Sequence, residues 1–81
     1  MYCVYYFENK FLLSRQDRVA IDHTVFARVT KQADAEKILF FLLEDIEVYE
    51  VMHSELEWQD KVAAIDSILD TEFENHLEFM K

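Results

Sequence analysis

Four carboxylates near the end of the chain recur at steps of four residues: Asp66, Asp70, Glu74 and Glu78. On a helix this spacing places them along one stripe, with about 6 Å of rise between neighbours. Each like-charged pair at this spacing costs an isolated helix about 0.2 to 0.5 kcal/mol, and carboxylates near a helix C-terminus also oppose the helix dipole. Because the row weakens its own helix, it predicts an anionic binding surface that contacts a partner.

A second group of acids precedes this row and is expected to extend the same surface if the fold brings the two groups to one side. It consists of Glu44, Asp45, Glu47 and Glu50. Residues 1–43 contain five acids and six bases, a net charge of +1, whereas residues 44–81 contain twelve acids and two lysines, a net charge of −10. Charge that is separated in this way creates a local field, whereas evenly mixed charge cancels within about 10 Å.

Other polar residues can be combined into a metal site or a hydrolase site only with poor specificity. Structural zinc takes four ligands, usually Cys or His, whereas this chain has one cysteine and three histidines, scattered from Cys3 to His76. Asp22 and His23 can be paired with Ser14 as a hydrolase site. The chain contains no glycine, however, and so lacks both a nucleophile elbow and a phosphate-binding loop. We therefore expect no enzyme, no cofactor and no metal.

The first part of the chain predicts strands that would support these charged segments. Eighty-one residues allow one domain over residues 1–81, because a chain of this length buries only about 60% of its unfolded surface. Residues 2–7 and 11–13 are rich in aromatic and apolar side chains and predict a hairpin, with Asn9 as the turn residue at positive φ. Residues 24–30 alternate as a third strand would. A loop, a strand extension and a helical turn are all open for residues 14–23.

The second part, residues 31–81, is expected to be helix, strand and helix. A largely buried helix follows the capping hydroxyl of Thr30. Residues 46–52 partly alternate and predict a fourth strand in a right-handed βαβ crossover, and a continued helix through residue 52 is the competing interpretation. Ser54 and Glu57 match a capping box, which would begin an amphipathic helix of about 25 residues.

The expected fold class is therefore α+β, with residues 1–30 β-rich. A small mixed or antiparallel sheet of three to four strands packs on two helices in the order ββ(β)αβα, and the C-terminal amphipathic helix is long.

The charge layout favours a protein that acts by binding another protein. In charge profile, though not in any motif, residues 44–81 resemble the small acidic DNA-mimic proteins of phages, which include anti-restriction and anti-CRISPR proteins. The resemblance carries over no functional residue. It implies an inhibitor that presents spaced anions to the basic, nucleic-acid-binding surface of a host protein, with exposed aromatics such as Tyr49 or Trp58 adding short-range affinity.

Two further interpretations compete with mimicry. An acidic face can serve only to keep a small aromatic-rich protein soluble, because added Asp and Glu favour solubility. Alternatively, the protein is a homodimeric interaction or accessory subunit that uses a tyrosine-rich sheet face, for which Tyr2, Tyr6 and Tyr49 are the candidates. Direct binding of nucleic acid is disfavoured, because phosphate contacts rely on clustered Lys and Arg.

The expected location is the cytoplasm, of the host cell if a phage encodes the protein. No apolar run exceeds seven residues, well below the ~20 that span a bilayer, so no membrane partner is expected.

Overall fold

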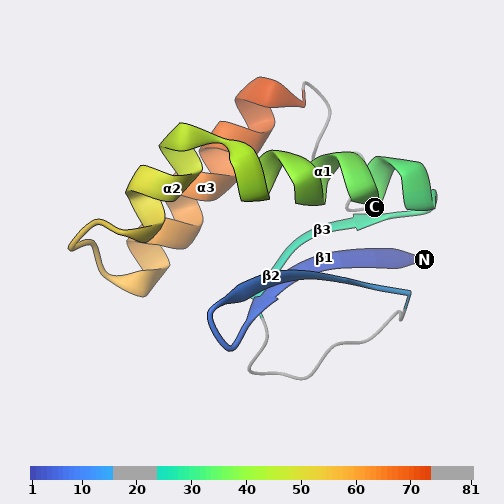
Figure 1. Cartoon of the computed structure of the whole chain (residues 1–81), viewed down its shortest axis with the longest axis horizontal. Helices are drawn as coiled ribbons and strands as arrows, with labels where there is room; N and C mark the ends of the chain where they lie inside the picture. Colours follow the sequence, from blue (N-terminus) through green and yellow to red (C-terminus); the bar gives the residue numbers. More distant parts are fainter. Residues whose placement is uncertain (16–23, 74–81) are drawn as a thin grey trace.

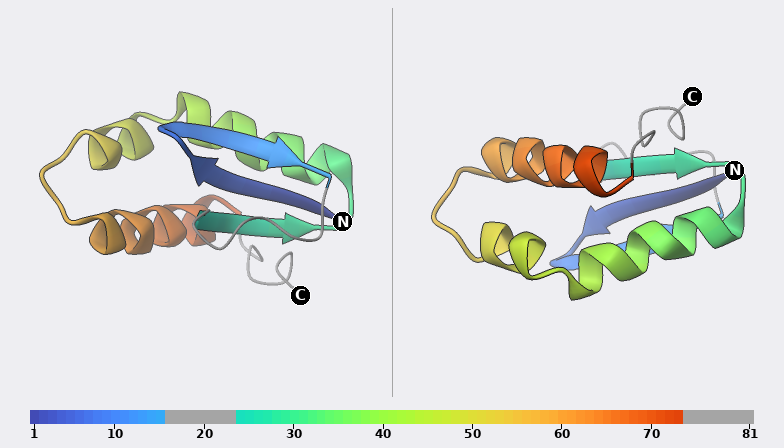
Figure 2. Two further views of the ribbon diagram at one scale, coloured as in Figure 1. Left: turned by 90° about the horizontal axis from the view of Figure 1, so that it is seen from below. Right: turned by 90° about the horizontal axis from the view of Figure 1, so that it is seen from above.

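The computed structural model describes residues 1–15 and 24–73 (Figure 1). In this part of the chain, strands β1 (Tyr2–Phe7), β2 (Lys10–Ser14) and β3 (Thr24–Val29) precede helices α1 (Gln32–Glu44), α2 (Ile46–Met52) and α3 (Trp58–Glu72). The strands form one antiparallel sheet in the order β2-β1-β3. The helices lie on one side of this sheet, and α2 extends past the end at which the hairpin turns (Figure 2). The predicted α+β class is confirmed.

The β1–β2 hairpin is closed by a two-residue turn at Glu8 and Asn9, between the paired residues Phe7 and Lys10. Both turn residues have positive φ angles, 50° at Glu8 and 66° at Asn9. Positive φ at both central positions is the type I′ pattern, whose twist matches the right-handed twist of the strands. The prediction for Asn9 is confirmed, whereas Glu8 adopts a backbone region that is uncommon for a glutamate.

Strand β3 confirms the third predicted strand and adds an irregularity to the sheet. Val4 pairs with Ala27, but the next residue, Tyr5, pairs with Val25, so Phe26 is the extra residue of a β-bulge. The side chains of Phe26 and Ala27 are both fully buried in the core. A bulge bends its strand and re-aims a side chain, which explains how two successive residues reach the same core.

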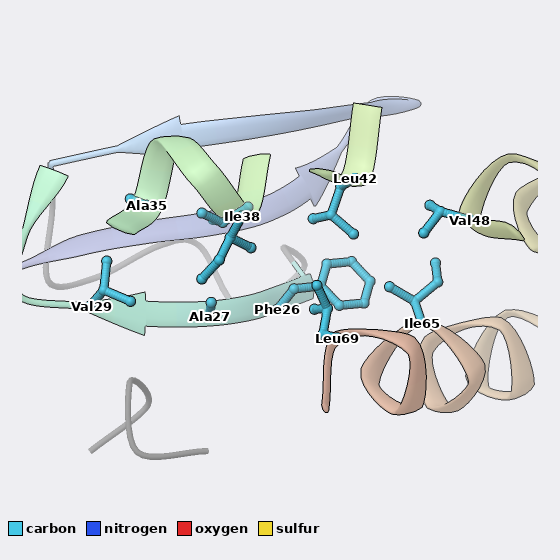
Figure 3. Packing of buried hydrophobic residues seen from close by; sticks show 10 residues of the cluster. Phe26, Ala27, Val29, Ala35, Ile38, Leu42, Val48, Ile65 and Leu69 are labelled. Atoms are coloured by element: carbon cyan, nitrogen blue, oxygen red, sulfur yellow. The ribbon is translucent and has the colours of Figure 1, made fainter. Parts of the chain in front are cut away.

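The hydrophobic core lies between the sheet and the helices. Figure 3 shows Phe26 of β3 surrounded by Leu42 of α1, Val48 of α2, and Ile65 and Leu69 of α3. Full burial of an aliphatic or aromatic side chain stabilises a fold by about 1.5 to 3 kcal/mol. Because each helix contributes to the same cluster, α2 and α3 are held to the sheet through their contacts with Phe26 and its neighbours.

The predicted fourth strand is wrong, because residues 46–52 form helix α2. Asp45 has an extended backbone, with φ −74° and ψ 130°, which ends α1 and begins α2. Its carboxylate accepts the backbone N–H groups of Glu47 and Val48 at 2.8 and 3.1 Å, so the first turn of α2 is capped. The alternative prediction, a helix that continues through residue 52, is closer to the structure, although the helix is interrupted at Asp45. The βαβ crossover is therefore absent, and in the described residues all strands precede all helices.

The capping-box prediction is also wrong. The Ser54 hydroxyl donates to the Val51 carbonyl at 2.6 Å and accepts the Leu56 N–H at 3.3 Å, so it completes the end of α2 and does not cap α3. Helix α3 begins only at Trp58. It ends at Glu72, where the backbone of Phe73 is extended, so it has 15 residues where about 25 were predicted. The cap predicted at Thr30 is also wrong, because the N-cap residue of helix α1 is Lys31, which makes no side-chain hydrogen bond there.

Candidate protein-binding site

Two of the predicted acids, Asp45 and Glu47, lie on a different side of α3 from Asp66 and Asp70. Asp45 and Glu47, at the start of α2, border a shallow depression of about 210 Å³ together with Ile68 and other α3 residues. Because Ile68 and its neighbours on α3 line this depression together with the first residues of α2, this side of α3 faces α2. Asp66 and Asp70 are each two residues from Ile68, a rotation of about 200° on a helix with 3.6 residues per turn. They therefore lie on the side of α3 that faces away from α2.

The predicted acidic residues also differ in how much of each side chain is exposed to solvent. Glu44, Glu47, Glu50 and Asp70 are exposed, and Asp66 is half-buried. Asp45 uses its carboxylate to cap α2, so its charge is tied to the fold. Glu74 and Glu78 lie outside the described residues. The structure thus leaves four of the predicted acids exposed, but it does not join Asp45 and Glu47 to Asp66 and Asp70 on one side of α3.

The basic residue of this region is used inside the fold. Residues 44–73 contain ten acids and one base, Lys61. The Lys61 ammonium donates to the backbone carbonyl of Met52 at 2.9 Å. A cation at the C-terminal end of α2 satisfies a free carbonyl and complements the helix dipole. Lys61 is therefore directed into the connection between α2 and α3, and residues 44–73, with ten acids and one lysine, together carry a net charge of −9.

An apolar groove opens between the hairpin turn and the junction of α1 with α2, and sequence reasoning did not find it. Its volume is about 640 Å³, within the 300 to 1,000 Å³ that is typical of ligand sites. The apolar lining includes Tyr6, Phe11, Leu42, Leu43, Val48 and Tyr49. These residues come from β1, β2, α1 and α2, so no local sequence pattern could have brought them together.

Four large apolar side chains of α1 and α2 are exposed to solvent, and two of them, Leu43 and Tyr49, line the groove. We call them the apolar corner, and they are Phe40 (60% exposed), Leu43 (58%), Ile46 (66%) and Tyr49 (59%). Phe40 lies one helical turn before Leu43, and Ile46 one turn before Tyr49, so each pair shares a helix face. Single exposed apolar residues are normal, but a cluster beside a groove is typical of an interaction site.

The three tyrosines predicted to form a partner face lie in different places. Tyr2 and Tyr6 are half-buried and pack against the core, so they belong to the sheet face that the helices cover. Tyr49 is on α2, and it lines the groove together with Tyr6. The opposite sheet face carries the alternate residues of β1, among them Cys3, which is fully buried and accepts a hydrogen bond from Arg28 at 3.4 Å. The structure therefore joins Tyr6 and Tyr49, but not Tyr2, in one site.

Aromatic contacts fix the wall of the groove that the sheet provides. The Tyr6 ring lies edge-on to Phe11, with centroids 5.1 Å apart, and Phe11 lies 5.8 Å from the ring of the core residue Phe26. Tyr6 also contacts Trp58 at 4.9 Å, and the Trp58 indole N–H donates to the Thr24 hydroxyl at 3.3 Å. Such contacts hold the rings in place, so this wall is formed before any ligand binds.

Comparison with known proteins identifies no relative, since no family model, curated protein or solved structure matches the chain. Within residues 1–15 and 24–73, no helix is long and apolar enough to cross a bilayer. In the same residues, no three His, Cys, Asp or Glu side chains converge as metal ligands would. Asp22, His23 and His76, which entered the metal and hydrolase interpretations, lie outside the described residues.

Proposed function

We propose that this protein acts by binding another protein that carries a basic surface, and that binding is its whole activity. The observation that supports this proposal is the charge of residues 44–73, in which ten acids accompany one lysine whose ammonium is bonded to the Met52 carbonyl. A field of one sign speeds the encounter with an oppositely charged partner and is weakened by salt. If the partner surface normally binds nucleic acid, docking blocks it and the protein is an inhibitor.

Imitation of a nucleic-acid backbone, as in the phage anti-restriction and anti-CRISPR proteins, remains a more specific prediction. It requires carboxylates that follow one continuous ridge, because a phosphate backbone presents its charges in regular succession. Asp45 and Glu47 lie on the α2 side of α3, whereas Asp66 and Asp70 lie on the other side. The general proposal, docking driven by charge, does not depend on such a ridge.

The proposal is tested by affinity capture from lysate with the intact protein and two charge variants. The first variant combines Glu44→Lys, Glu47→Lys and Glu50→Lys. The control combines the same change at acids outside residues 44–73, namely Glu8→Lys, Asp34→Lys and Glu36→Lys, so both variants have the same net charge. All capture is repeated at about 0.1 M and about 1 M salt, which shortens the screening length from about 10 Å to about 3 Å.

We expect the unmodified protein and the control to retain the same partner at low salt and to release it at high salt. The first variant should lose this partner while keeping the melting temperature of the control. A partner that the first variant and the control retain equally would refute the proposal. The captured partner is then assayed for nucleic-acid binding with and without the protein, and only a loss of that binding supports an inhibitor.

A further inference from the structure

We propose that the apolar groove and the apolar corner bind an amphipathic helix of the partner, whose bulky apolar side chains are flanked by lysine or arginine. This inference rests on the proposed function and names the part of the partner that would be recognised. The groove supplies the apolar contact, and neighbouring carboxylates supply the charge that selects a basic helix. Helices that lay one apolar face into a hydrophobic groove are a common mode of peptide recognition.

The floor and rim of the groove fit an apolar anchor. Leu42 and Val48 form a floor that is continuous with the core, since both are almost fully buried. Leu43 and Tyr49 stand at the rim and remain more than half exposed, so they have apolar surface left to bury. The Tyr49 ring stacks on His53 with centroids 4.1 Å apart, which restrains the ring on the side of the groove formed by α2. A restrained rim lowers the entropy lost on binding.

Charge around the apolar corner indicates which kind of helix would bind. Glu44 follows Phe40 by four residues on α1, and Glu50 follows Ile46 by four residues on α2, so each glutamate is a neighbour of an exposed apolar residue on its helix, with about 6 Å between Cβ atoms. Both glutamates are exposed, and in the described residues neither forms an ion pair. The hairpin side of the groove carries Lys10. The basic residues of the partner helix should therefore lie toward α1 and α2, away from the hairpin.

A second copy of this chain fits the site less well than a basic helix does. Each copy has a net charge of −9, so two apolar corners brought together would also bring Glu44 and Glu50 close to the like charges of the other copy. Like charges that face each other across an interface oppose association by several kcal/mol. The acidic surroundings thus favour a partner of opposite charge, and we expect the free protein to be a monomer.

The probe for this inference is a labelled amphipathic peptide with Leu and Trp at helical positions i, i+3, i+4 and i+7 and with Lys at the other positions. Two control peptides replace either the apolar residues by Ser or the lysines by Glu. Binding is measured by fluorescence anisotropy with the intact protein and with Leu43→Ser, Tyr49→Ser and Leu56→Ser. Leu56 is also exposed but does not line the groove, so its variant is the matched control.

We expect Leu43→Ser and Tyr49→Ser each to weaken binding of the Leu/Trp/Lys peptide about tenfold, as loss of an interface anchor does. Leu56→Ser should change binding by less than about twofold, and all three variants should melt close to the unmodified protein. Removing either the apolar residues or the lysines from the peptide should also weaken binding about tenfold or more.

Equal binding of the Ser peptide and the Leu/Trp peptide would overturn the groove inference, yet it would leave charge-driven docking intact if salt still released the peptide. Binding that neither salt nor the loss of lysine changes would overturn the proposed function as well. A dimer in sedimentation of the free protein that Tyr49→Ser converts to a monomer would overturn the inference in favour of a second copy.

Discussion

The carboxylate of Asp45 both caps helix α2 and carries a negative charge. Two substitutions at this position distinguish the effect of the cap from the effect of the charge. The carboxylate accepts backbone N–H groups of Glu47 and Val48 at 2.8 and 3.1 Å, and it is itself one of the acids predicted to bind a partner. Asp45→Ala removes the cap and the charge together. Asp45→Asn keeps an oxygen that can accept the same two hydrogen bonds and removes only the charge, because Asn and Asp are about equally good at this position.

The size of the effect follows from the position of α2 in the fold. Loss of an N-cap side chain costs about 1 kcal/mol, within a range of about 0.5 to 2 kcal/mol. Loss of a negative charge at the start of a helix costs about 0.3 to 1 kcal/mol through the helix dipole. Val48, in the first turn of α2, is buried in the core, so weakening of this helix lowers the stability of the whole domain. Asp45→Ala should therefore be less stable than Asp45→Asn by about 1 kcal/mol.

The measurement is urea unfolding followed by circular dichroism, supported by thermal melting. A difference of about 1 kcal/mol lowers the melting temperature of a domain of 60 to 100 residues by about 4 to 8 °C. Glu47→Ala is the matched control, since it removes an exposed charge from the same turn without removing a cap. The reasoning fails if Asp45→Asn is as unstable as Asp45→Ala, or if Glu47→Ala destabilises as much as Asp45→Ala.

Two other predictions follow from the core and the hairpin. Phe26→Ala should destabilise the protein by about 3 to 5 kcal/mol, because it empties the centre of the core. The control Phe40→Ala, on the exposed apolar corner, should change stability by less than about 0.5 kcal/mol. A similar loss of stability for both variants in urea unfolding would contradict the assigned core. Glu8→Gly should leave the stability unchanged or raise it by up to about 1 kcal/mol, because glycine adopts the positive φ of this position without steric cost. A clear fall in melting temperature would show that the type I′ turn is misassigned.

The two proposals concern different ranges of the same association. In the first proposal, the negative charge of residues 44–73 acts over the screening length and would govern how fast a basic partner arrives. In the second proposal, the groove acts only at contact, where buried apolar area would govern how slowly the partner leaves. A variant of Glu44 or Glu50 should therefore change the association rate and its salt dependence, whereas a variant of Leu43 or Tyr49 should change the dissociation rate.

Local sequence patterns determined the strands of this protein. The aromatic and apolar runs of residues 2–7 and 11–13 and the alternation of residues 24–30 predicted β1, β2 and β3, because side chains in a strand alternate between two faces and branched or aromatic residues fit the pleated surface. The turn was predictable at Asn9 because few non-glycine residues accept a positive φ. Net charge, and the excess of acids after residue 43, follow directly from composition.

Packing between elements decided what short-range patterns could not. Residues 46–52 alternate only in part. They form a helix and not a strand because the Asp45 carboxylate caps the helix and Val48 reaches the core from it. The Ser54 hydroxyl donates a hydrogen bond to the Val51 carbonyl of α2, so it does not cap the start of α3. The placement of α2 beside α3 puts Asp45 and Glu47 on one side of α3. The groove forms where the hairpin meets the junction of α1 with α2. These features depend on residues far apart in the chain, whose proximity is set by burial of a shared core.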